Sequence, residues 1–211
     1  MSGPPAGVTI RDIRPEDVDG AVEVVARSFH QDPGARIVEP DPARRPEAMR
    51  HLTGPIVRAA VAHGHVVVAV TPDGSIVGVA TWLPPGKESP TDEELLAAGL
   101  AEGHAAVPEA AARMGPMAGA LEDLHASNIS GEHWRLEFFG VDPAWQGTGL
   151  GLALIETGHA KADAAGQPCW LETFTQRNVD WYARRGYRIA ATSTVPTGQP
   201  IWGLIRDPQP R

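Results

Sequence analysis

The sequence contains only one cysteine, Cys169, among its 211 residues. A single cysteine cannot form a disulfide within the chain, which excludes the disulfide-stapled class of small secreted domains and suits a reducing compartment. Cys169 lies in an apolar, strand-like run. We therefore expect a buried structural thiol there rather than a catalytic nucleophile.

Long apolar runs are also missing. No stretch approaches the roughly 20 apolar residues that a helix needs to cross a bilayer. The N-terminal residues, Met1 to Pro5, lack the basic and apolar regions of a signal peptide. These two absences predict a cytoplasmic protein that has no membrane partner.

A surplus of positive charge is missing as well, since the formal net charge is −8. A nucleic-acid partner is disfavoured, because phosphate backbones require a basic surface. A cationic partner such as an amine would be attracted, although a charge of this size is also common on an ordinary protein surface. The hydrophobic content of 42% is enough for one domain with a sizeable core.

The most informative segment that is present is the glycine-rich run Gln146–Gly151. It lies between a strand-like run over 134–141 and an amphipathic run over 150–165. Three glycines, Gly147, Gly149 and Gly151, remove side chains where the helix is expected to begin. Backbone N–H groups at the positive end of a helix dipole would then be exposed, which predicts a phosphate-binding loop.

Two common phosphate loops are excluded by spacing. A Walker loop requires Lys followed by Ser or Thr after its last glycine, whereas Leu152 and Ala153 follow Gly151. The dinucleotide fingerprint needs a different glycine spacing and usually occurs early in the chain. A nucleotide triphosphatase and a dinucleotide-binding oxidoreductase are therefore both disfavoured.

Periodicity and turn residues give the order of the elements. Strands are predicted over 8–14, 65–70, 75–83, 134–141, 168–174, 187–195 and 200–206. Helices are predicted over 15–29, 46–63, 150–165 and 178–185, with one or two more over 91–125, broken near Pro108 and Gly115-Pro116. Residues 31–45 are expected to form a mobile loop. Mostly antiparallel strands followed by a late β–loop–α–β unit indicate a mixed α+β sheet.

The run Gly140–Gly151 resembles the acetyl-CoA loop of the GNAT superfamily of N-acetyltransferases. Later runs over 171–173, 178–182 and 185–187 are similar to the next motif of that superfamily. Within it, His133-Trp134 and 171–173 most resemble puromycin N-acetyltransferase-like proteins. The resemblance extends from about His133 to Arg206. It is fainter over the first strand, the first helix and Trp82, and absent over about 90–131.

This resemblance implies the GNAT fold, a central, mostly antiparallel, splayed sheet flanked by helices. It implies a single domain over 1–211, with a core over 8–206 and a helical acceptor-side insertion over 90–131. The implied activity is direct acetyl transfer from acetyl-CoA to a primary amine of a small molecule, such as an antibiotic or a toxic amine, without a metal. A protein N-terminus or lysine as acceptor, and a non-catalytic acyl-CoA sensor, remain alternatives. Dimers are common among such proteins, although no stretch of the sequence shows an interface.

The resemblance also assigns the residues that would bind acetyl-CoA. The pantetheine arm is expected on the backbone of one strand, and the pyrophosphate on the N–H groups of the following loop. Asn178 would hydrogen-bond the arm. The strand and loop residues are Phe139, Gly140, Val141, Gln146, Gly147, Thr148, Gly149, Leu150 and Gly151.

The resemblance places Tyr182 at the general-acid position, on the same helix face as Asn178. A buried core tyrosine with a satisfied hydroxyl is the alternative. Glu137 and Glu172 are the candidates for accepting the proton of the amine, and water is a third. An acid within an apolar strand is costly unless it is paired or functional, and Arg135 shares the face of Glu137 and is a ready partner.

The acceptor side is assigned from position in the chain. Phe29 and His30, at the end of the first helix, and Trp82, at the end of the hairpin, are candidate walls of the acceptor pocket. His133 is also assigned to substrate binding. Core packing explains Phe29 and Trp82 equally well. His125 and His133 are candidates for assisting proton transfer, although a solvated or capping role is more common for such histidines.

Overall fold

The computed structural model describes residues 3–87 and 89–209. Seven strands form one sheet in the order β1-β2-β3-β4-β5-β7-β6. All neighbouring strands are antiparallel except β4 and β5, which are parallel, and this confirms the mixed class predicted from the sequence. The strands are β1 Thr9–Asp12, β2 His65–Val70, β3 Ile76–Leu83, β4 Trp134–Val141, β5 Cys169–Thr173, β6 Tyr187–Thr194 and β7 Pro200–Arg206.

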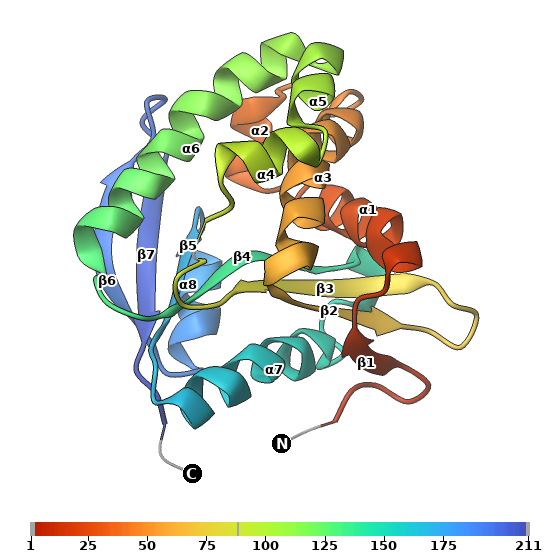
Figure 1. Ribbon diagram of the computed structural model, residues 1–211, viewed down its shortest axis with the longest axis vertical. Coiled ribbons are helices and arrows are strands. Elements are labelled where there is room, and N and C mark those ends of the chain that lie inside the picture. The colour runs from red at the N-terminus through yellow and green to blue at the C-terminus, as the bar shows by residue number, and fades with distance from the viewer. Residues whose placement is uncertain (1–2, 88, 210–211) are drawn as a thin grey trace.

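Helices cover both faces of this sheet (Figure 1). Val24 and Val25 of α1 pack with Val68 and Val79 on one face. On the other face, the apolar residues of α7 pack against β2 and β3. The helices are α1 Val18–Ser28, α2 Pro33–Val38, α3 Arg45–His63, α4 Asp92–Ala97, α5 Leu100–Ala106, α6 Pro108–Asn128, α7 Leu150–Ala165 and α8 Gln176–Ala183, with short 3-10 turns at Pro15–Asp17 and Pro143–Trp145. Within the described ranges no helix is both long and apolar enough to cross a membrane.

The sheet is split between β4 and β5. These two strands pair only at Trp134↔Cys169 and Arg135↔Trp170. Beyond that point β4 continues alongside β3 as far as Val141, while β5 follows β7 as far as Thr173. The inner edges of both strands are therefore not bonded to each other over their second halves, which confirms the predicted splay.

A β-bulge lies at the start of this split. Thr81 of β3 pairs with Phe138, but the next residue, Trp82, pairs with Leu136. Glu137 is consequently the extra residue of β4. A bulge of this kind bends the strand and redirects a side chain, and such bulges are common next to active sites.

Two predicted segments differ from the structure. The expected mobile loop over 31–45 contains helix α2, which Asp32 caps by accepting a hydrogen bond from Gly34 N, and whose Ala35 and Val38 are buried. The predicted helical stretch over 91–125 forms three helices, α4 to α6, and Pro116 does not break α6. Packing of α6 against the end of the sheet through Leu124 outweighs the loss of one helical hydrogen bond.

Candidate active site

The glycine loop forms at the C-terminal end of β4, where the predicted helix begins. Gly149 is the N-cap of α7 and has a φ of 91°, and Gly147 has a φ of 80°. Both values lie in the left-handed region that favours glycine. The side chain of Gln146 donates from Nε2 to Val141 O at 3.1 Å, which fixes the loop against the strand. Leu152 N and Ala153 N both donate to Gly149 O, so the N–H groups of Leu150 and Gly151 are the ones that the start of α7 leaves without an intrahelical acceptor.

Two glycines allow close approach around the end of β4. A Cβ atom on Gly151 would lie 3.3 Å from the ring of Phe139, so the first turn of α7 sits directly on the strand. A Cβ atom on Gly140 would lie 2.4 Å from Ser28 Oγ of α1. Residues 139–141 therefore keep their place between α1 and α7, with one backbone edge facing the split.

Helix α8 lines the opposite side of the split. Asn178 Nδ2 donates to Thr173 Oγ1 at 3.0 Å, which orients the amide at the end of β5. Tyr182 is only 7% exposed. Burial raises the pKa of Tyr182, so its hydroxyl is protonated at neutral pH.

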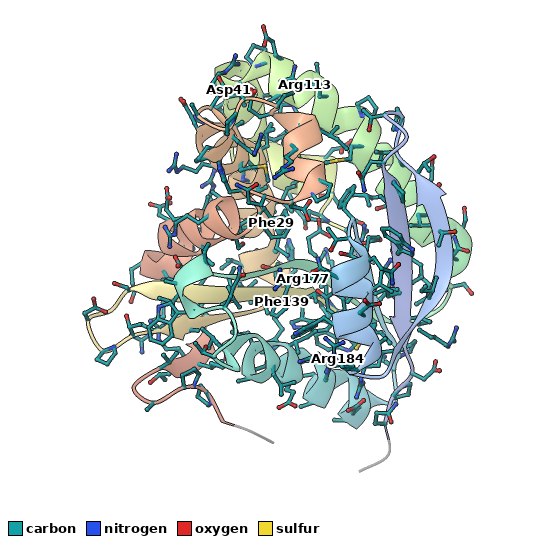
Figure 2. The ribbon with its side chains drawn as sticks, turned by 180° about the vertical axis from the view of Figure 1, so that it is seen from behind. Phe29, Asp41, Arg113, Phe139, Arg177 and Arg184 are labelled. Atoms are coloured by element: carbon teal, nitrogen blue, oxygen red, sulfur yellow. The ribbon has the colours of Figure 1, made fainter. Side chains whose placement is uncertain are left out.

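An aromatic contact joins the two sides below the split. The rings of Phe139 and Trp181 are 5.7 Å apart. Figure 2 shows Phe29, Arg177 and Phe139 along the middle of the molecule, between the half that contains α1 and the half that contains α8. Residues far apart in the sequence thus converge on the region where β4 and β5 separate.

Both candidate proton acceptors contact one buried arginine. Arg135 Nε lies 3.6 Å from Glu137 Oε2, and one terminal nitrogen lies 3.2 Å from Glu172 Oε1. The other terminal nitrogen donates to Glu122 of α6 at 2.8 Å. Three carboxylates thus surround one guanidinium whose side chain is 6% exposed. Arg135 pairs with Glu137, as the sequence indicated, but it pairs with Glu172 as well.

The two acids differ in their access to solvent. The side chain of Glu137 is 20% exposed, whereas that of Glu172 is 9% exposed. Trp170 Nε1 donates to Glu172 at 2.6 Å. Burial raises the pKa of Glu172 to about 7, although Arg135 counteracts this effect. A carboxylate that titrates near neutral pH is suited to exchanging protons during turnover.

His125 and His133 are both buried and bonded to each other, so the solvated role expected for them is wrong. Their Nε2 atoms are 2.7 Å apart, and His133 Nδ1 donates to Gly131 O at 2.8 Å. Arg135 lies 3.3 Å from His125 Nδ1. Burial, aided by Arg135, lowers the pKa of His125 to about 4, so it is neutral at pH 7. These contacts of His125, His133 and Arg135 connect α6 to the start of β4.

The three residues predicted to line the acceptor pocket do not lie together: Trp82 is on the opposite face of the sheet from Phe29 and His30. Phe29 packs edge-on against Phe138 of β4, with ring centroids 6.0 Å apart, and His30 follows it. Trp82 is fully buried on the other face of the sheet, where a Cβ atom on Gly158 of α7 would lie 2.1 Å from its ring. Trp82 is therefore a core residue and does not line the acceptor side. Its place at the end of the hairpin did not reveal which face it would occupy.

One carboxylate near the split was missed by the sequence interpretation. Asp32 falls in the segment expected to be a mobile loop, but it is partly buried between α1 and α2. Its position directly before Pro33, a common first residue of a helix, was the signal that could have identified a cap.

The arrangement fits a ligand that has a pyrophosphate and an extended amide arm. N–H groups without an intrahelical acceptor lie at the start of α7, the inner edge of β4 is open beyond Arg135, and α8 carries Asn178 and the buried Tyr182. Cys169 is buried, as expected from the sequence, and burial raises its pKa to about 12. Among the described residues no group of three or more His, Cys, Asp or Glu side chains is placed to hold a metal ion.

Known proteins share this sequence pattern and this fold. A family model described as the acetyltransferase (GNAT) domain matches residues 62–189. A structure from Corynebacterium glutamicum, described as histone acetyltransferase HPA2 and related acetyltransferase, is 26% identical over 97% of this chain and 98% of that one, with a TM-score of 0.63. Arylalkylamine N-acetyltransferase 2 from Aedes aegypti is 16% identical over 96% and 99%, with a TM-score of 0.64.

A third structure was solved with a ligand. PaiA N-acetyltransferase from Thermoplasma acidophilum, in complex with coenzyme A, is 14% identical over 98% of this chain and 99% of that one, with a TM-score of 0.58. The family model spans more than half of the present sequence, including the glycine loop and α8. The chain therefore belongs to the GNAT family of acetyltransferases, enzymes that use acetyl-CoA as their acetyl donor.

Proposed function

We propose that this enzyme transfers the acetyl group of acetyl-CoA directly to the primary amine of a small molecule. The observation that carries the proposal is the split between β4 and β5, with the glycine loop directly after β4 and Tyr182 on α8, the helix that follows β5. The loop N–H groups would bind the pyrophosphate, and the open edge of β4 over 139–141 would bind the pantetheine arm.

Each step of the transfer has a candidate residue. When bound, acetyl-CoA supplies an acetyl thioester that the amine attacks. Glu137 accepts the proton that the nitrogen must lose, because it is the more exposed of the two acids on Arg135. Tyr182 donates its proton to the departing sulfur, and a backbone N–H of β4 stabilises the developing oxyanion.

Two features bear on the acceptor: the position of helices α4 to α6 and the substrate class of an enzyme with the same fold. Helices α4 to α6 extend over 92–128, and α6 packs against β5, β6 and β7. We propose that this segment is the acceptor-side insertion of a single domain. The arylalkylamine enzyme with the same fold supports an amine of low molecular weight. The puromycin-like signature at His133-Trp134 and 171–173 supports the same class, but it does not identify the acceptor.

Titration calorimetry with acetyl-CoA tests the first half of this proposal, with ATP and NAD as controls. We expect saturable binding of acetyl-CoA alone. Thiol release is then measured against a panel of small amines and against peptides with a free N-terminus or lysine. Release with small amines supports the proposal. Release with peptides only would make this a protein acetyltransferase, and binding without any release would favour an acyl-CoA sensor.

The role of Glu137 predicts a large loss of rate on Glu137→Gln. We expect kcat at pH 7 to fall by about 100-fold, the usual contribution of general-base catalysis, because the amide cannot accept a proton. Binding of acetyl-CoA should be unchanged, because Glu137 does not belong to the glycine loop. Stopped-flow thiol release and calorimetry provide the two measurements.

Glu172→Gln is the matched comparison, since it removes a carboxylate from the same arginine and keeps an acceptor for Trp170. A smaller loss of kcat is expected for this variant. A larger loss in Glu172→Gln than in Glu137→Gln would reverse the two assignments. Equal activity of both variants and the wild type would leave water as the proton acceptor.

A further inference from the structure

The segment 29–34, which is the connection from α1 and the start of α2, crosses the split in the sheet. At its first end, Phe29 packs on Phe138 of β4. At its other end, a Cβ atom on Gly34 would lie 3.0 Å from the ring of Phe174, directly after β5. The connection therefore joins the β4 side to the β5 side at the level where the two strands no longer pair. Asp32 lies inside this connection.

The carboxylate of Asp32 is partly buried and is held by the backbone rather than by a salt bridge. Asp32 Oδ1 accepts a hydrogen bond from Gly34 N at 2.8 Å, which caps α2. Asp32 forms no ion pair within the part of the chain that the structure describes. The nearby Arg36 donates instead to the side chain of Gln31. Burial raises the pKa of Asp32, and this effect outweighs the hydrogen bonds from the backbone of Gly34 and Ala35 and the charge of Arg36, which all lower it.

Asp32 acts electrostatically on the proposed general acid. Burial is the main cause of the raised pKa of Tyr182, Arg185 counteracts it, and the charge of Asp32 raises it further. The two groups come from opposite sides, Asp32 from the connection above the split and Tyr182 from α8. A cation bound by Asp32 would therefore lie within electrostatic reach of the Tyr182 hydroxyl.

The other acids near the split are already compensated. Glu137 and Glu172 both contact Arg135. Glu39, which follows α2, pairs with Arg44 and Arg113. Unlike these acids, Asp32 has no salt bridge within the described residues, and a partly buried charge of this kind gains from a cationic partner.

We propose that Asp32 binds the acceptor as an ammonium ion at the mouth of the split between β4 and β5. This inference rests on the proposed function, and it makes Asp32 a specificity-determining residue. Alkylamines, which are protonated at pH 7, would be favoured over aromatic amines, which are neutral. The bound ammonium loses one proton to Glu137 before the nitrogen attacks, and the second proton, shed as the amide forms, replaces the one that Tyr182 gives to the sulfur.

Asp32→Asn isolates the charge from the cap, because asparagine caps helices about as well as aspartate. We expect the KM for a protonated alkylamine to rise about tenfold or more, the usual effect of losing a hydrogen bond to a charged group. The KM for a neutral aromatic amine should change little. In both cases the affinity for acetyl-CoA should stay close to that of the wild type.

Asp41→Asn is the control. Asp41 Oδ1 accepts from Ala43 N at 2.9 Å in a similar local cap. Figure 2 shows Asp41 at the far end of the molecule from Phe139. Both variants should unfold at the temperature of the wild type, and Asp41→Asn should leave every KM unchanged. An equal rise in KM for charged and neutral amines, a fall in kcat at unchanged KM, or no effect of Asp32→Asn would each overturn the proposal.

Calorimetry separates this inference from the proposed function. An alkylamine is titrated into the protein saturated with coenzyme A, which cannot donate an acetyl group. Weaker binding to Asp32→Asn than to the wild type supports the ammonium site even if no tested amine is acetylated. Equal binding overturns it even if the wild type acetylates amines.

Discussion

Tyr182→Phe is expected to lower kcat by about 100-fold or more, the range for loss of a general acid. The affinity for acetyl-CoA should be retained, since the loop N–H groups and the edge of β4 are untouched. The thiolate leaving group would then have to take its proton from water. Steady-state thiol release and calorimetry with acetyl-CoA give the two quantities.

The second tyrosine of the chain provides a matched control. Tyr187 is also buried, but its hydroxyl lies 3.0 Å from His159 Nε2 in the core. Tyr187→Phe removes a hydroxyl of the same kind, so a loss of stability with unchanged kcat is expected. If Tyr182→Phe keeps the wild-type kcat, Tyr182 is a core aromatic, and the proton comes from elsewhere.

Arg135→Met is expected to cost about 3–5 kcal/mol of folding free energy, the usual penalty for breaking a buried ion pair on one side. Methionine preserves most of the volume but leaves Glu137 and Glu172 without their shared cation. Glu122 is half-exposed and can turn to water. Urea unfolding measures the loss, because the midpoint shifts while the slope stays constant.

The loss should also depend on pH. Burial already raises the pKa of Glu172 to about 7, and Arg135 is the main group that lowers it, so removing Arg135 raises it further. The folded state then holds the proton more tightly than the unfolded chain, and stability falls as pH rises from about 4.5 through the folded pKa. The variant should therefore be less destabilised at pH 5 than at pH 8.

Arg188→Met is the control for this experiment. Arg188 pairs with Asp207 at 3.6 Å, and both side chains are more than half exposed. Surface pairs of this kind contribute about 0–1 kcal/mol, so little change is expected at either pH. A loss for Arg135→Met that is equally small, or that is independent of pH, would show that the three carboxylates do not depend on Arg135.

Regular elements were predictable wherever local periodicity matched the tertiary environment. Helix α7 has the bounds expected from its apolar stripe, and the hairpin of β2 and β3 follows from the turn at Pro72-Asp73-Gly74. The interpretation failed where packing outweighed local signals. Helix α6 continues through Pro116, and α2 forms in a segment rich in proline and charged residues.

The sequence by itself determined the family and the glycine loop, because spacing along the chain fixes where backbone N–H groups are exposed at the start of a helix. It also placed Glu137, Glu172 and Tyr182 on elements next to that loop. Only the tertiary structure decided which side chains meet. Arg135 forms ion pairs with acids from β4, β5 and α6. Trp82 lies in the core on the face of the sheet that α7 covers, and the segment that carries Asp32 crosses the split between β4 and β5. Long-range packing sets these contacts. The spacing of residues along the chain does not specify which face of the sheet buries a side chain or which charged residue lies beside it.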